Sequence, residues 1–170
     1  MLCCQIGLNA KVPFHFLFYS LTFGGSAFYS FIVSPLVFKK LPREEFSNLQ
    51  NKVFPTYFTG QALAPIVLGL AQPFAYCPFT IGLLALSSVG GALNYLWLLP
   101  VCKKIKEDRN KLIADKKDVG ADGQPTEELK ALNKQFGKYH GISTLVNITS
   151  IVSLGVYGVV LAKALTKIKF

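Results

Sequence analysis

Long uncharged stretches alternate with short segments that hold nearly all of the charge in this chain. No Asp, Glu, Lys or Arg occurs in residues 12–38, 53–102 or 139–162. A helix needs about 20 mainly apolar residues to cross a bilayer core that is about 30 Å thick. The first and third stretches therefore predict one crossing each. The middle stretch predicts two crossings, with a break at residues 72–78.

This pattern predicts an all-α membrane protein, a bundle of four transmembrane helices at about 13–38, 53–71, 79–101 and 139–165. The apolar spacing within 41–52 predicts a short separate helix that lies in the membrane interface. The polar segment 103–138 predicts helical extensions of its two neighbouring membrane helices. Gly120, Gly123 and Pro125 interrupt that segment, which predicts a mobile centre at 119–125.

Composition agrees with a membrane protein: 51% of the 170 residues are hydrophobic and only 16% are charged. A soluble domain usually carries about 25% charged residues. The formal net charge of +9 does not indicate nucleic-acid binding, because the cationic residues gather at the ends of the apolar runs. Lys and Arg in such places set topology or meet anionic lipid headgroups.

The Lys and Arg counts predict the orientation of the chain in the membrane. The segments after the first and third predicted helices hold 14 of the 18 Lys and Arg residues. We therefore expect both segments to face the cytosol, with both termini on the opposite side. Palmitoylation of Cys3 and Cys4 would need cytosolic access, so we interpret these residues as ordinary thiols. The basic segment 103–138 is a candidate surface for an anionic lipid or a protein partner.

Four polar residues share one predicted depth. Each lies nine residues from a flanking lysine, which at 1.5 Å per residue is about 13 Å into the membrane. They are Ser30, Gln61, Asn94 and Asn147. Buried amides in membranes usually face the bundle interior and bond to each other. We expect these amides to bond together, with two alternatives open: a layer that fixes helix register, or a binding site for a small ligand.

No catalytic group is predicted from the sequence. His15 is predicted near the outer face of the membrane and His140 near the inner face. A shared metal site is therefore not expected, because the two side chains lie too far apart to bind one ion. We predict no cofactor and no metal. The favoured hypothesis is a non-enzymatic protein that acts through partner or lipid contacts. The alternative is a carrier of a small molecule or metal complex that uses the polar layer, and a homodimer stays open.

Several motifs resemble the transmembrane protein 205 family, and together they span most of the chain. One motif joins His15, Ser20 and Gly24 to Leu41-Pro42-Arg43, and the most specific one runs from Phe46 through Gln50, Lys52 and Pro55 to Phe58. The others are Asn94-x-x-Trp97-Leu98-x-Pro100 and Phe136-x-Lys138-Tyr139-His140-Gly141-Ile142-Ser143-x-Leu145-x-Asn147. The resemblance implies four helices, a eukaryotic source and no established reaction.

Overall fold

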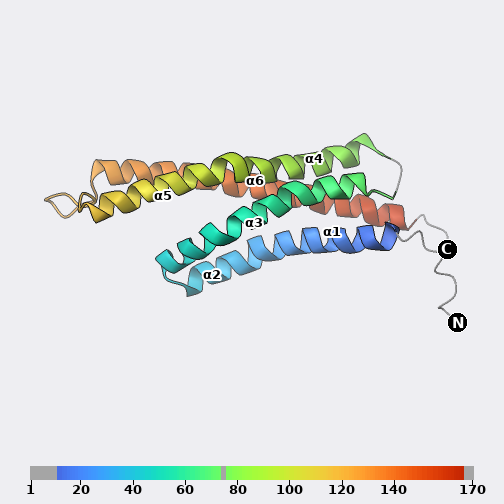
Figure 1. Cartoon of the computed structure of the whole chain (residues 1–170), viewed down its shortest axis with the longest axis horizontal. Coiled ribbons are helices and arrows are strands. Elements are labelled where there is room, and N and C mark those ends of the chain that lie inside the picture. Colours follow the sequence, from blue (N-terminus) through green and yellow to red (C-terminus); the bar gives the residue numbers. More distant parts are fainter. Residues whose placement is uncertain (1–10, 74–75, 167–170) are drawn as a thin grey trace.

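The chain forms four long helical rods in a computed structural model that describes residues 11–73 and 76–166. The first rod joins α1 (Lys11–Phe28), the π-helical turn η1 (Tyr29–Val33) and α2 (Ser34–Lys40), and the second is α3 (Arg43–Leu70). The third joins α4 (Pro78–Leu93), the π-helical turn η2 (Asn94–Leu98) and α5 (Leu99–Ala114), and the fourth is α6 (Glu127–Leu165). All four rods are long and apolar enough to cross a membrane. The predicted fold, an all-α bundle of four helices in a multi-pass membrane protein, is confirmed (Figure 1).

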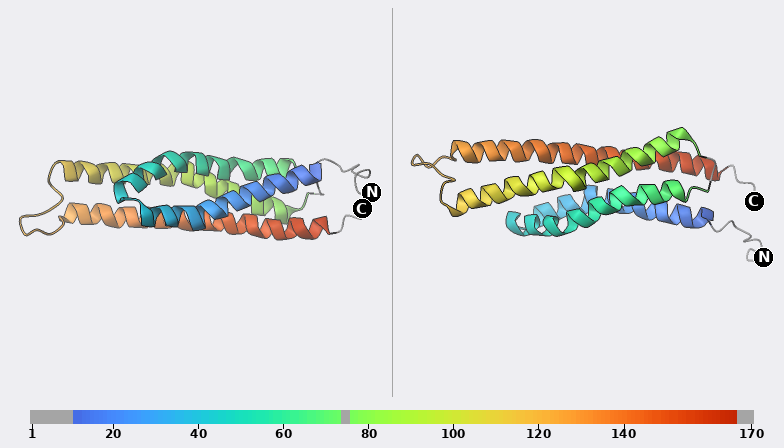
Figure 2. Two further views of the ribbon diagram at one scale, coloured as in Figure 1. Left: turned by 90° about the horizontal axis from the view of Figure 1, so that it is seen from below. Right: turned by 45° about the horizontal axis from the view of Figure 1, so that its top comes forward.

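The rods pack around a small core and turn apolar faces outward. α4 packs against α3 and α6, and α1 contacts the same two helices (Figure 2). The core between them is built from Tyr19, Leu68, Leu84, Leu154, Tyr157 and Leu161. Leu21, Leu70 and Leu96 are each more than 70% exposed. Such an apolar surface suits contact with lipid tails.

The second rod differs from the prediction, because α3 is one helix from Arg43 to Leu70. The prediction of a separate interfacial helix at 41–52 is therefore wrong. Pro42 precedes the helix, and Glu44 and Glu45 occupy its first turn, where acidic side chains favour a helix start. Only the polarity changes between residues 52 and 53, and a change in polarity alone does not end a helix.

The connection between α5 and α6 is a hydrogen-bonded turn. The Gly120 amide donates to the Gln124 carbonyl at 2.8 Å, and the Gly123 amide donates to the Gly120 carbonyl at 3.0 Å. Gly123 has a φ of +75°, which glycine adopts without steric cost. Thr126 closes the turn by capping α6, since its side chain accepts a hydrogen bond from the Leu129 amide. The mobility predicted for residues 119–125 stays a prediction.

Two halves of the chain repeat one pattern. The first reads Gly24-Gly25, Tyr29, Pro35 and Lys39-Lys40, and the second reads Gly90-Gly91, Tyr95, Pro100 and Lys103-Lys104. The α3 start, Pro42-x-Glu44-Glu45 followed by Lys52-x-Phe54-x-x-Tyr57, returns at the α6 start as Pro125-x-Glu127-Glu128 followed by Lys134-x-Phe136-x-x-Tyr139. The spacings differ by one residue at several points, so the two halves share an order of elements: a helix, a π-helical turn, a helix with a proline near its start, and a second long helix.

The two π-helical turns occupy corresponding places in these halves. The Ser34 amide bonds to the Tyr29 carbonyl, and the Leu99 amide bonds to the Asn94 carbonyl, each five residues back. Both donors immediately precede a proline. A proline ring clashes with the carbonyl four residues before it, and a wider turn relieves that clash. Isolated π turns within α-helices are frequent at functional sites.

A candidate polar site within the bundle

A polar cluster inside the bundle joins three of the rods. Its members are Ser30 on η1, Tyr57 and Gln61 on α3, and Asn147 on α6. The Asn147 Oδ1 atom accepts hydrogen bonds from the Tyr57 hydroxyl at 2.9 Å and from Gln61 Nε2 at 2.8 Å. The Asn147 Nδ2 atom donates to Ser30 Oγ at 3.0 Å. Three of the four residues placed at one depth by the sequence therefore lie together.

The bonds within the polar cluster form a closed ring with a single direction. Ser30 Oγ and the Tyr57 hydroxyl lie 2.8 Å apart. When the Tyr57 proton goes to Asn147 at 2.9 Å rather than to the Ser26 carbonyl at 3.4 Å, Ser30 donates to Tyr57 and accepts from Asn147. Every hydroxyl in the ring then both donates and accepts once. Such a ring satisfies polar groups that would otherwise be costly in an apolar interior.

Asn94 does not join this ring, which differs from the expectation that it bonds to Asn147. Its Nδ2 atom donates to the Gly90 carbonyl at 3.3 Å, and its Oδ1 atom accepts from the Ser143 hydroxyl at 2.5 Å. Asn94 is fully buried. Asn94 and Ser143 therefore form a second, separate polar pair between η2 and α6.

Two buried oxygens beside these groups have no hydrogen-bond partner among the described residues. They are Gln61 Oε1 and Ser87 Oγ. Gln61 is only 2% exposed, and Ser87 is completely buried. Because Gln61 already donates to Asn147, its open carbonyl oxygen requires a donor from elsewhere. This open acceptor is the chemical feature of the site that can recognise a ligand.

Tight helix packing surrounds the site. A β-carbon added to Gly91 would lie 2.6 Å from the Ala62 backbone nitrogen and 2.7 Å from the Gln61 carbonyl carbon. The backbones of α3 and α4 therefore approach closely beside Gln61, as small residues allow in membranes. The Ser88 hydroxyl donates to the Ala62 carbonyl at 2.6 Å and links the same two helices.

Sequence reasoning missed Tyr57 and Ser143. Tyr57 lies four residues before Gln61, and Ser143 lies four residues before Asn147, so each shares a helix face with a predicted member. That spacing was the available signal. Their hydroxyl groups gave no reason by themselves to expect burial, because a hydroxyl can bond to its own helix backbone.

The remaining motif residues have varied surroundings. Gln50 is buried and accepts a hydrogen bond from Tyr29 at 2.5 Å while donating to Ser34 at 3.2 Å. The Tyr139 ring lies edge-on to Trp97, and the His140 ring stacks on Phe136. Arg43 and Lys52 are exposed and have no side-chain hydrogen bond within the described parts of the chain, and the other motif residues carry no side chain that could form one: Pro42, Pro55 and Gly141.

His15 and His140 lie far apart, as expected. His15 Nε2 bonds to the Tyr157 hydroxyl at 2.7 Å. Tyr157 follows His140 by 17 residues on the same helix, which is about 26 Å at 1.5 Å per residue. Among the described residues, no group of three or more His, Cys, Asp or Glu side chains could hold a metal ion. Cys3 and Cys4 lie outside the described residues.

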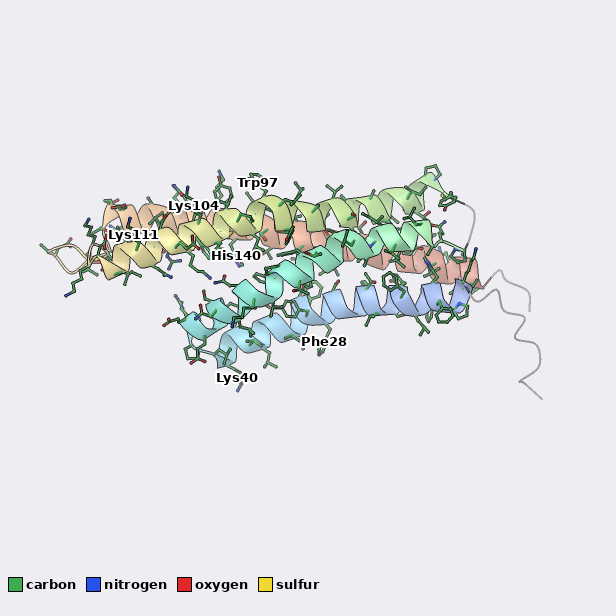
Figure 3. All side chains as sticks on the ribbon, in the orientation of Figure 1. Phe28, Lys40, Trp97, Lys104, Lys111 and His140 are labelled. Atoms are coloured by element: carbon green, nitrogen blue, oxygen red, sulfur yellow. The ribbon has the colours of Figure 1, made fainter. Side chains whose placement is uncertain are left out.

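The cationic residues gather at one end of the bundle. Lys40, Lys104 and Lys111 lie at the end that holds the α2–α3 and α5–α6 connections (Figure 3). Lys106 links α5 to α3, because its Nζ atom donates to Ser47 at 2.5 Å and to Asn51 at 2.8 Å. The Arg109 guanidinium lies 5.6 Å from the centre of the Phe136 ring. The first described residue of α1 and the last of α6 lie at the opposite end (Figure 1).

Comparisons with known proteins place these features in a family context. A family model described as a domain of unknown function (DUF4149) matches residues 17–111, a range that includes both π turns. "Xanthocillin biosynthesis cluster protein D" of Aspergillus fumigatus is 27% identical over 161 residues, which cover 91% of this chain and 90% of that protein. An uncharacterized protein of Aquifex aeolicus is 33% identical over 130 residues, which cover 76% of this chain and 80% of that protein. No solved structure matches the chain.

Proposed function

Because the chain belongs to the DUF4149 family, which has no assigned function, we propose its function from its own geometry. The protein is a non-enzymatic membrane protein that binds and carries a small, uncharged polar molecule. The ligand binds at the polar cluster of Ser30, Tyr57, Gln61 and Asn147. This is the carrier alternative from the sequence, with the ligand class narrowed.

One observation carries this proposal: a π-helical turn interrupts one helical rod in each half of the chain, next to polar residues that the sequence places near the membrane middle. Ser30 belongs to η1, and Asn94 of the neighbouring polar pair belongs to η2. In carriers built from repeats, ligand sites lie near the bilayer midplane, at the interface between repeats and beside discontinuous helices. The corresponding positions of η1 and η2 fit that arrangement.

The chemistry of the cluster supports an uncharged ligand. Ser30, Tyr57, Gln61 and Asn147 are all uncharged, and no Asp, Glu, Lys or Arg lies in the apolar stretches before Lys163. An ion held here would lack the opposite charge that its burial requires. The open Gln61 Oε1 atom favours a molecule with an N–H or O–H donor.

Two family relations bear on this proposal. We assign the chain to the transmembrane protein 205 type on its motifs, including Gln50 and His140. The name of the Aspergillus relative places that protein in the xanthocillin biosynthesis cluster. The motifs imply a eukaryotic source. The comparisons do not support that source, because the Aquifex relative is bacterial, so it stays a prediction.

Solute flux into proteoliposomes tests the proposal. Stopped-flow light scattering would follow the entry of urea, formamide and glycerol as uncharged hydrogen-bond donors. We expect faster entry of at least one solute than in empty liposomes. Gln61→Leu and Asn147→Leu should return that rate to the empty-liposome value. Thr149→Leu is the matched control, because Thr149 is an exposed α6 residue whose hydroxyl bonds to its own helix.

Loss of flux must be separated from loss of folding. Each variant should therefore elute as a single peak in detergent and reach the same density in the liposomes as the unchanged protein. If none of the three solutes enters faster than in empty liposomes, the carrier function is refuted. An equal loss of rate in Thr149→Leu would show that the polar cluster is not the path.

A second candidate function is contact with anionic lipid at the basic end. Lys103 and Lys104 are exposed one to two turns beyond Trp97, and Arg109 Nε is buried with no partner among the described residues. A Lys or Arg near an anionic surface contributes about 1 kcal/mol. Lys103→Gln with Lys104→Gln should then abolish a melting-temperature gain in phosphatidylserine nanodiscs over phosphatidylcholine. The same change at Lys116, in the distant turn, should preserve the gain.

A further inference from the structure

The far end of the bundle, where α1 begins and α6 ends, holds a buried polar pair that the polar cluster does not use. His15 is 4% exposed and Tyr157 is 2% exposed, and they bond at 2.7 Å. When the Tyr157 hydroxyl donates to Nε2, the ring proton of His15 lies on Nδ1. The His15 ring also interacts with the backbone of Ala71, so both sides of the imidazole contact protein.

A cavity of about 580 Å³ opens beside this pair, between α1 and the end of α3. His15 and Ala71 both line it. Its walls are apolar: Phe14, Phe18, Val67 and Leu70. Ligand sites in proteins usually measure about 300–1,000 Å³ and combine apolar walls with a few placed polar groups.

The polar residues that line the cavity are Lys11, His15 and Gln72. Lys11, an exposed residue at the start of α1, lines it together with His15. Lys11 is the last charged residue before the uncharged stretch 12–38, so the Lys11 end of the cavity lies at the level of the lipid headgroups. Leu70, on the opposite wall, is 76% exposed, which opens the cavity toward lipid.

We propose that this cavity binds a long-chain fatty acid that enters from the surrounding lipid. The carboxylate pairs with the Lys11 ammonium at the polar end of the cavity. The acyl chain lies along the Phe14, Phe18, Val67 and Leu70 walls. This site is independent of the proposed carrier function.

Photolabelling tests the site. The full chain in phosphatidylcholine nanodiscs would be exposed to a palmitic acid that carries a diazirine and an alkyne, and labelled peptides would be mapped after illumination. We expect labels within residues 11–18 and 67–72. Lys11→Gln should weaken labelling about fivefold, as expected for the loss of one partly exposed ion pair.

A matched pair of tryptophan variants keeps the test specific. Leu70→Trp places a bulky ring in the cavity and should abolish labelling. Leu96→Trp changes an equally exposed leucine on η2, 73% exposed, and should leave labelling unchanged. Both variants should retain the melting temperature of the unchanged protein, since both side chains face lipid.

Three results would overturn the proposal. One is equal labelling of the Leu70→Trp and Leu96→Trp proteins. Another is labelling spread over the lipid-facing surface rather than confined to the two segments. The third is stronger labelling by a photoreactive lysophosphatidic acid than by the fatty acid, which would assign the site to a phosphate headgroup.

Discussion

Replacing Asn147 with Leu should destabilise the bundle far more than the same change at Asn94. Asn147 makes three hydrogen bonds to other rods, with Tyr57, Gln61 and Ser30. Asn94 makes one, with Ser143. Hydrogen bonds between membrane helices average about 0.6 kcal/mol each. Asn147→Leu should therefore cost about 1.8 kcal/mol, and Asn94→Leu should cost about 0.6 kcal/mol.

The assay is the free energy of unfolding in mixed detergent micelles, measured for single and double variants. Gln61 and Asn147 bond directly at 2.8 Å, so Gln61→Leu with Asn147→Leu should cost about 0.6 kcal/mol less than the sum. Asn94 and Asn147 share no bond among the described residues, so their double variant should be additive within about 0.5 kcal/mol. Thr149→Leu should change stability little.

The opposite pattern would refute the reasoning. If Asn94 and Asn147 couple while Gln61 and Asn147 are additive, the amides pair as the sequence alone predicted and the ring is wrong. Equal costs for Asn94→Leu and Asn147→Leu would also contradict the count of bonds.

Three further predictions concern packing, orientation and the long connection. Gly91→Ala should lower stability by about 1–3 kcal/mol, the usual cost of overpacking. Gly82→Ala on the same helix should be tolerated, because nothing lies within 4 Å of its added carbon. Equal unfolding free energies for the two variants would contradict the close approach of α3 and α4. A cysteine placed at Asp122 should react with a membrane-impermeant reagent only from the cytosolic side, and reaction solely from the other side would reverse the orientation. Limited proteolysis should cut within residues 119–125 before it cuts within 76–78, and the reverse order of fragments in mass spectra would show that the wrong connection was considered mobile.

The membrane spans and the depth of the polar residues could be predicted from the sequence because both follow from distances along a helix. Uncharged runs fix where a rod can cross the membrane. A count of nine residues from a flanking lysine placed Ser30, Gln61 and Asn147 at one level, since each residue adds 1.5 Å. Because neighbouring helices alternate in direction, the same count works from either end.

Partners around the helix axis could not be predicted in this way. Depth says nothing about the direction in which a side chain points, so Asn94 shared the level of Asn147 yet bonds to Ser143. The π turns add to this uncertainty, because an extra residue in a turn rotates the rest of the rod by about 100° around its axis. The spacing of apolar residues in the sequence does not reveal the position of η1 or η2. Only the prolines just after them, Pro35 and Pro100, hint at their positions.

The two similar halves of the chain differ in how their polar pairs bond. When Tyr57 is aligned with Tyr139, Gln61 corresponds to Ser143, since each follows its tyrosine by four residues. Each then bonds to an asparagine, but Gln61 reaches Asn147 on α6, whereas Ser143 reaches Asn94 on η2. The second pair is complete within its own half. The first pair crosses between halves and leaves Gln61 Oε1 open. Of these two polar pairs, only the first therefore offers an open acceptor to a ligand, and that acceptor lies on α3.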